Sequence, residues 1–280
     1  MIPSRKIVKI SPGLAASDGA GVKLTRYIGA PDIDMLDPFL LLDRFASDNP
    51  DDYLGGFPEH PHRGFETVTY ILAGRMRHKD NVGHEGVINP GDVQWMTAGR
   101  GIIHSEMPEQ TDGLLEGFQL WVNLAAQDKM TAPAYHEYPA AAIPEENHDQ
   151  NVTVKVISGQ TDHGTKGAVT AASDNPLFLD VTLKAGGSFH QSIPADHNGF
   201  IMVIDGVVQA DGAGPELGAR ELGILGDGDY VILTSKGGDS RFLVIAGRLL
   251  NEPVARSGPF VMNTKDQVMQ AYQDYRTGKF

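Results

Sequence analysis

Short runs of apolar residues alternating with polar ones dominate the chain and predict β-strands along most of its length. The runs are rich in Val, Ile, Thr, Tyr and Phe, and Gly, Pro, Asn or Asp bounds each of them. This rhythm favours a β-sandwich or β-barrel. The expected strands cover residues 6–10, 21–29, 65–74, 92–99, 116–124, 152–159, 177–186, 199–208, 229–235 and 241–247.

The last part of the chain has a different period. Thr264 is followed three residues later by Gln267, which is the signature of a helix-capping box. Val268, Tyr272 and Tyr275 then recur at helical spacing, and Gly278 follows as a stop. We therefore expect one amphipathic helix over residues 263–278 that docks its apolar stripe on one of the β domains.

The two halves of the chain are similar to one another in two short stretches. Gly64-Phe65 matches Gly199-Phe200, and Gly91-Asp92 matches Gly228-Asp229, which favours two similar barrels in tandem. Residues 135–150 combine prolines, alanines and clustered charges, as a linker does. The expected limits are an N-terminal domain over 1–137, a linker over 138–150, a second domain over 151–250, and a tail with the helix over 251–280.

Composition excludes several classes of function. The 280 residues carry a formal net charge of −13 with a pI near 5.1, which opposes direct binding to nucleic acid. The absence of cysteine excludes disulfides, thiolate metal sites and a cysteine nucleophile, so any metal must be bound through nitrogen and oxygen. No apolar stretch is long enough for a signal peptide or a membrane span, and we expect a cytoplasmic protein without membrane contact.

Two pairs of residues have the spacing of metal ligands. Because side chains alternate along a strand, His60 and His62 point the same way, and so do His104 and Glu106. The Gly-rich turns at residues 90–92 and 98–101 suit hairpins that return the second pair beside the first. Three imidazoles and one carboxylate can hold iron, zinc or nickel and leave two positions of an octahedral ion open, as catalysis requires.

The remaining histidines are interpreted as ordinary. A structural hydrogen bond is expected for His84 in the sequence GHEG. No ligand role is expected for His78, His136, His148, His163, His190 or His197.

The ligand pairs also lie in segments that resemble a known family. HPHRGFETVTYILAG resembles the first cupin motif, and PGDVQWMTAGRGIIHSEMP resembles the second in the form found in pirins. LDPFLLLDRF, GHEG and SGPFVMNT extend the resemblance toward both ends of the chain. It implies an all-β fold of two tandem cupin-type β-barrel (jelly-roll) domains with a short C-terminal α-helix. It also implies one divalent metal ion in the N-terminal domain, held by His60, His62, His104 and Glu106.

A second carboxylate competes for the ligand role. The general cupin pattern would nominate Glu66, which lies four residues after His62 and so is expected on the same strand face. The pirin pattern selects Glu106 instead and leaves Glu66 as an outer-shell residue or a competing ligand. In the second half, the repeat places Ala195 and His197 at the positions of His60 and His62, and a residue near Arg241 at that of His104. One histidine cannot hold a catalytic ion.

The resemblance implies a quercetin 2,3-dioxygenase activity, in which a flavonol is cleaved with O2 and carbon monoxide is released. Fe(II) is the expected metal, with Ni, Cu, Mn and Zn as alternatives, and Glu106 is the candidate base. Phe57, Trp95 and Phe118 are aromatic candidates for the substrate surface, although core packing is their commoner role. The alternatives are a redox-sensing iron protein that regulates a protein partner and a metal-stabilised scaffold without catalysis.

Overall fold

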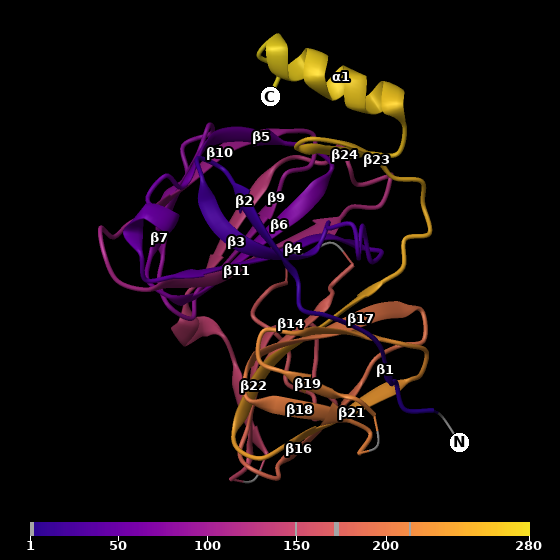
Figure 1. Ribbon diagram of the computed structural model, residues 1–280. Coiled ribbons are helices and arrows are strands. Elements are labelled where there is room, and N and C mark those ends of the chain that lie inside the picture. Colours follow the sequence, from indigo (N-terminus) through magenta and orange to yellow (C-terminus); the bar gives the residue numbers. More distant parts are fainter. Residues whose placement is uncertain (1–2, 149, 171–173, 213) are drawn as a thin grey trace. The chain divides into compact units, whose positions relative to one another are not determined.

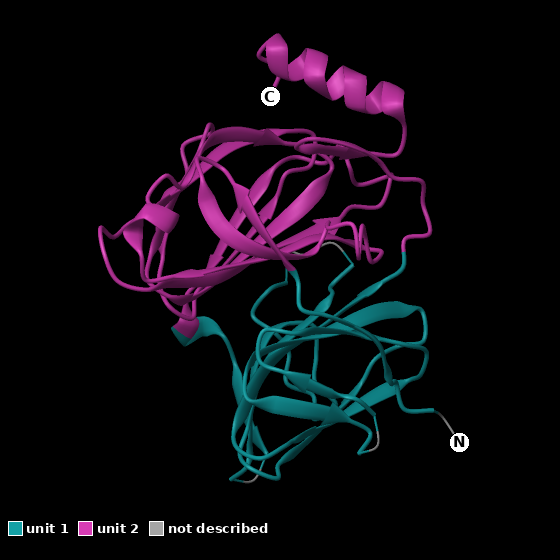
Figure 2. Cartoon of the chain, in the orientation of Figure 1, with its two compact units in different colours: residues 1–13, 141–249 teal, residues 14–140, 250–280 magenta. Residues whose placement is uncertain are grey.

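The computed structural model describes residues 3–148, 150–170, 174–212 and 214–280 (Figure 1). The chain forms two compact units, one made of residues 14–140 and 250–280 and the other of residues 1–13 and 141–249 (Figure 2). We call them the first and the second barrel. Strands dominate both units, and the described residues contain a single α-helix near the C-terminus, so the all-β prediction is confirmed.

The first barrel is built from two antiparallel sheets. A seven-stranded sheet has the order β12-β9-β6-β11-β4-β3-β2, and a four-stranded sheet has the order β5-β10-β7-β8. Apolar side chains from both sheets pack together, among them Leu24 and Ile71 from the larger sheet and Met76 and Ile88 from the smaller. The strands are β2 (Leu14–Asp18), β3 (Val22–Ile28), β4 (Phe39–Ser47), β5 (Phe57–His62), β6 (Phe65–Ala73), β7 (Met76–Asp80), β8 (Glu85–Ile88), β9 (Val93–Thr97), β10 (Ile102–Pro108), β11 (Leu115–Asn123) and β12 (Ala134–Tyr138), with a 3-10 turn η1 (Pro50–Asp52).

The second barrel repeats this plan. Its seven-stranded sheet has the order β1-β20-β17-β22-β15-β14-β13, and its four-stranded sheet has the order β16-β21-β18-β19. The core between them is continuous and apolar, with Val, Leu, Ile and Phe from both sheets. The strands are β1 (Ile7–Ser11), β13 (Glu145–His148), β14 (Val152–Ser158), β15 (Leu177–Leu183), β16 (Ser188–Ser192), β17 (His197–Asp205), β18 (Val207–Ala210), β19 (Glu216–Gly218), β20 (Leu222–Leu225), β21 (Tyr230–Ser235) and β22 (Ser240–Arg248), with a 3-10 turn η2 (Ala140–Ala142) before β13.

The matching strand orders correct the repeat found in the sequence. Gly64-Phe65 and Gly199-Phe200 do lie at the starts of the equivalent strands β6 and β17. Gly91, however, precedes β9, whereas Gly228 precedes β21, the equivalent of β10. The true counterpart of Gly228 is Gly101, and the two share an unusual backbone φ of +148° and +147°. This shift moves the counterparts of His104 and Glu106 in the second barrel.

The N-terminal residues belong to the second barrel. The sequence placed residues 1–137 in one domain, but β1 pairs with β20, and Arg5 donates hydrogen bonds to the carbonyls of Gly226 and Pro194. The chain starts in the second barrel, forms the first, and then returns. The sequence does not indicate which barrel β1 joins, because an edge strand has the same alternation of apolar and polar residues in either barrel. The exact domain limits remain a prediction.

The C-terminal helix forms where the sequence predicts it. α1 (Lys265–Arg276) has Thr264 as its N-cap, with the capping box to Gln267 complete. Its buried residues Val268 and Ala271 pack on the hairpin of β23 (Ala255–Ser257) and β24 (Phe260–Met262). No helix of the described residues is long and apolar enough to cross a membrane.

Candidate metal centre

Three histidines lie together on the four-stranded sheet of the first barrel. His60 and His62 come from β5 and His104 from β10, where His104 is the register partner of His60. Their nearest ring nitrogens lie within 4.8 Å of one another. The ring centroids are 4.7 Å apart for His60 and His62, 4.4 Å for His60 and His104, and 5.0 Å for His62 and His104. Paired strands thus bring together residues that are 42 to 44 positions apart in the sequence.

The ring nitrogens are arranged as in a metal site. His60 donates from Nδ1 to the Pro58 carbonyl at 2.8 Å, which leaves Nε2 as an acceptor. Among the described residues, the buried His62 Nδ1 and His104 Nε2 have no hydrogen-bond partner. Burial, followed by the neighbouring histidines, holds the pKa of His62 and of His104 well below the usual 6.5. Neutral imidazoles with unpartnered nitrogens fit a divalent metal, which would satisfy them.

Glu106 lies beside the three histidines but outside their group of mutually close donors. It lines the same cavity as His60 and His62, and its Oε1 accepts a hydrogen bond from Thr69 at 2.9 Å. Burial raises the pKa of Glu106, and the neighbouring His60 and the Thr69 bond act against that rise. Thr69 Oγ1 also lies 2.7 Å from Gln119 Oε1. A hydroxyl has one proton, and Thr69 uses it toward Glu106. If the Gln119 amide is flipped, its NH2 group donates to Thr69, and a hydrogen-bonded chain runs from Gln119 through Thr69 to Glu106.

Glu66 is held elsewhere. Its two oxygens accept hydrogen bonds from Trp95 Nε1 at 3.0 Å and from Thr97 Oγ1 at 2.8 Å. The expectation that Glu66 shares a strand face with His62 is wrong, because β5 ends at His62 and Glu66 lies on β6 in the other sheet, after a turn at Gly64 with φ +89°. Alternation does not carry across such a break. Neither Glu66 nor Glu106 belongs to the histidine group, and the choice of carboxylate ligand remains a prediction.

A cavity of about 570 Å³ opens over this site. Phe57 is part of its wall, whereas Trp95 and Phe118 are fully buried, so of the three aromatic candidates only Phe57 lines it. The sequence did not single out Trp121, whose ring lies 5.1 Å from that of His62. The lining also contains Leu24, Leu41, Phe45, Met76, Trp121, Arg26, Asp43, Glu59, Gln119 and Arg256.

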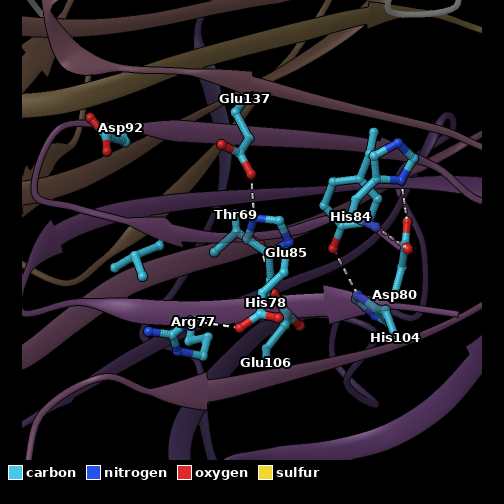
Figure 3. A network of polar contacts seen from close by, with 12 residues as sticks. Thr69, Arg77, His78, Asp80, His84, Glu85, Asp92, His104, Glu106 and Glu137 are labelled. Atoms are coloured by element: carbon cyan, nitrogen blue, oxygen red, sulfur yellow. Dashed lines mark hydrogen bonds and ion pairs between the residues drawn. The ribbon is translucent and has the colours of Figure 1, made fainter. Parts of the chain in front are cut away.

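A set of aromatic and polar residues lies on the Nδ1 side of His104. Tyr135 on β12 places its hydroxyl 3.3 Å from His104 Nδ1, and its ring stacks on His78 at 4.8 Å. His78 contacts Glu137 at 2.5 Å, and His84 contacts Asp80 at 2.7 Å (Figure 3). The structural hydrogen bond predicted for His84 is thereby confirmed.

Sequence reasoning missed Tyr135 because it lies in the stretch interpreted as a linker. The two tyrosines, Tyr135 and Tyr138, were the available signal that this stretch begins with a strand, because aromatic residues are enriched in strands.

Comparisons with known proteins match the whole chain. A family model described as Pirin matches residues 21–122, and one described as Pirin C-terminal cupin domain matches residues 178–280. A Caulobacter vibrioides pirin-like protein is 52% identical, with all of both chains covered. A Pseudomonas aeruginosa protein named as a candidate quercetin 2,3-dioxygenase is 46% identical over 98% of this chain and 97% of its own. The crystal structure of an Acinetobacter baumannii quercetin 2,3-dioxygenase matches with a TM-score of 0.90 and 35% identity over 99% of both chains.

Proposed function

The chain belongs to the pirin family of two-domain cupins, and we propose that it is an Fe(II)-dependent dioxygenase of the quercetin 2,3-dioxygenase type. Its substrate would be a flavonol or a similar flat phenol, cleaved with O2 and with release of carbon monoxide. The observation that carries the proposal is the group of three histidines beside a cavity of about 570 Å³. Relatives named for this activity support it at 46% and 35% identity.

The histidines are suited to hold the ion. His60, His62 and His104 would each present one unprotonated nitrogen, and the chain offers no thiolate to compete. Iron bound there would supply Lewis acidity and one-electron chemistry toward dioxygen. The Pro58 carbonyl and the Tyr135 hydroxyl contact the opposite nitrogens of His60 and His104, and such bonds fix the orientation of a ligand ring.

The cavity has the shape and polarity for a flat phenol. Apolar side chains from two sheets, including Leu24, Leu41 and Met76, would pack on the faces of an aromatic ring. Arg256 lies at 5.2 Å over the ring of Trp121 and donates to the Leu40 carbonyl, so a guanidinium is fixed in the wall. Volumes of 300 to 1,000 Å³, roughly, are typical of small-molecule sites.

Glu106 is the proposed base. A substrate hydroxyl that enters the site must lose its proton, and Glu106 is a buried carboxylate that lines the cavity together with His60 and His62. Its raised pKa makes it a better proton acceptor than an exposed carboxylate. Thr69 would hold the carboxylate in place while the proton moves to it. A Glu106→Gln variant should keep the fold and lose turnover, and full turnover with bound metal in that variant would contradict this role.

The experiment that tests the proposal is anaerobic reconstitution with Fe(II) followed by aerobic addition of quercetin. Flavonol absorbance and carbon monoxide are followed together, with His60→Ala as the negative control and His190→Ala, an exposed histidine of the second barrel, as the matched control. We expect both signals in the wild type and in His190→Ala, and neither in His60→Ala. Iron binding without flavonol consumption would contradict the proposal and favour the redox-sensing regulator.

A further inference from the structure

The second barrel carries another group of metal-type donors, far in sequence from the proposed catalytic ligands. Glu146 and His148 lie on β13, and His163 lies in the loop between β14 and β15. One donor atom from each lies within 4.8 Å of the others. From the sequence, no ligand role was expected for His148 or His163. Glu146-x-His148, however, repeats the strand spacing of His60-x-His62, with both side chains on one face.

The carboxylate of this group is fixed for metal binding. Glu146 Oε2 accepts a hydrogen bond from Thr161 Oγ1 at 2.6 Å, and Oε1 contacts His148 Nε2. Its side chain is 10% exposed. A hydroxyl that orients a ligand carboxylate is typical of outer-shell support in metal sites.

The third donor comes from a turn that is held rigidly. Thr161 donates its N–H to the Thr165 carbonyl at 3.0 Å, and Gly164 donates to the Thr161 carbonyl at 2.9 Å. Neighbouring Asp162 is anchored by the Ser192 N–H and hydroxyl. The turn places the His163 ring 3.9 Å from that of His148, at an interplanar angle of 41°. The loop therefore presents His163 to the strand in a fixed position.

We propose that Glu146, His148 and His163 form a second divalent-metal site, with Zn(II) as its occupant. Two imidazoles and one carboxylate are ligands that zinc accepts, and a water would complete a tetrahedral shell. The site is independent of the dioxygenase proposal, since it lies in the other barrel and shares none of its residues. Its role is structural. A bound ion ties the edge strand β13 to the loop before β15 and so stabilises the second barrel.

The experiment counts zinc in the untagged full-length chain after chelation and equilibration with Zn(II) alone. A His60→Ala/His104→Val background removes the first site, and we expect it to retain one zinc per chain. Adding His163→Gln should abolish binding of that zinc at the same free zinc concentration. Adding His197→Gln, which replaces a histidine of the same barrel outside the group, should leave zinc binding unchanged. A background that binds no zinc, or a His163→Gln chain that keeps its zinc, overturns the proposal.

A second readout does not depend on whether the chain with His163→Gln folds. Zinc at 100-fold excess over its dissociation constant should raise the unfolding midpoint of the second barrel in the double-variant background by at least about 5 °C. No rise in the midpoint overturns the proposal even if His163→Gln fails to fold. Glu146→Gln should weaken zinc binding at least about tenfold, because the charged ligand is lost while its shape is kept.

Discussion

The two barrels share one strand order but fill their interiors differently. His104 lies three residues after Gly101 and opposite His60, and Val231 lies three residues after Gly228 and opposite Gln191. Extended along the strands, the same register gives the counterparts of the four proposed ligands. For His60, His62, His104 and Glu106 they are Gln191, Ile193, Val231 and Leu233.

These counterparts differ from the ones inferred from sequence. His197 begins β17, the equivalent of β6, and Arg241 lies on β22, where it pairs with Asp180. Neither lies on a strand equivalent to β5 or β10. The alignment through Gly91 and Gly228 was displaced by one strand, which is why it selected Arg241. The alignment through Gly64 and Gly199 selected His197 because Gly199 lies seven residues after the end of β16, whereas Gly64 lies two residues after the end of β5.

The comparison shows what the fold requires and what it does not. In the second barrel Ile193, Val231 and Leu233 are buried in the continuous apolar core. In the first barrel, the same positions carry polar groups beside a cavity of about 570 Å³. Burying polar groups and leaving a cavity both cost stability, so the plan of two sheets tolerates a site but does not need one. We infer that the first barrel gives up packing in order to bind metal and substrate.

The largest effect is expected when a residue of the second barrel is placed in the first. His104→Val introduces the counterpart residue and leaves two imidazoles, so metal affinity should fall by at least about 100-fold and turnover should vanish. The apo protein should keep its fold, because a buried unpartnered nitrogen is removed. Titration calorimetry and circular dichroism check both statements. Gln191→Leu in the second barrel is the control and should leave the catalytic metal unchanged.

The reverse comparison tests packing. Leu233→Ala removes a fully buried side chain from the core of the second barrel and should lower its free energy of unfolding by about 2–5 kcal/mol. Metal binding by the first barrel should not change. Glu106→Ala at the equivalent position should cost the apo protein less, since that side chain faces a cavity. Urea unfolding of both variants measures the difference, and equal losses would contradict the division into site and core.

The matched glycines Gly64 and Gly199 are held in different ways. Gly199 lies within β17 and pairs by register with Leu225 and Ala246. The Gly64 carbonyl accepts a hydrogen bond from the buried Lys129 at 2.7 Å. Lys129 also donates to Asn123 Oδ1 at 2.6 Å and to the Val261 carbonyl at 3.0 Å, and so links the end of the ligand strand to the C-terminal hairpin.

Lys129 should make the first barrel sensitive to alkaline pH. Burial, opposed by Glu252, lowers the pKa of Lys129 to about 8 from 10.5. Between pH 8 and pH 10.5 the unfolded chain binds more protons at Lys129 than the folded chain does, so the free energy of unfolding rises with pH in this range. The contribution of Lys129 is present above pH 10.5 and is lost as the pH falls through 8. The slope is at most about 1.4 kcal/mol per pH unit.

Lys129→Met should remove that slope and, because three buried acceptors lose their donor, lower the free energy of unfolding by about 1–3 kcal/mol. Denaturant unfolding at several pH values compares it with Lys236→Met, a lysine of the second barrel. A slope that survives in Lys129→Met would assign the pH dependence to other groups.

Sequence reasoning reached the local features and failed where the chain crosses between sheets. The alternation of apolar residues predicted ten strands that the structure contains, and Thr264 with Gln267 predicted the helix, because these signals lie within a few residues. Other strands, such as β4 and β7, were not among the ten. The strand face predicted for Glu66 was wrong because the chain turns at Gly64 and enters the other sheet. The grouping of His148 with His163 was missed since their proximity depends on a folded loop, which no local pattern encodes.

The smallest predicted effect concerns support for the site from outside the ligand set. The Tyr135 hydroxyl lies 3.3 Å from His104 Nδ1, a long contact that orients the ring without binding metal. Tyr135→Phe keeps the stacking on His78 and removes only this hydroxyl. Because outer-shell contacts contribute about 10–100-fold to metal affinity and this one is long, we expect a loss near tenfold.

Tyr138→Phe on the same strand is the matched control for this last change, since residues three apart on a strand face opposite ways. It should leave metal affinity unchanged, and both variants should unfold within about 1 kcal/mol of the wild type. Calorimetric titration with Fe(II) under anaerobic conditions separates the two. If both variants bind as the wild type does, His104 is oriented by strand pairing alone, and the first barrel differs from the second only in the side chains that face its cavity. A loss confined to Tyr135→Phe would show that the metal centre extends to β12, a strand whose equivalent in the second barrel, β1, comes from the N-terminal residues.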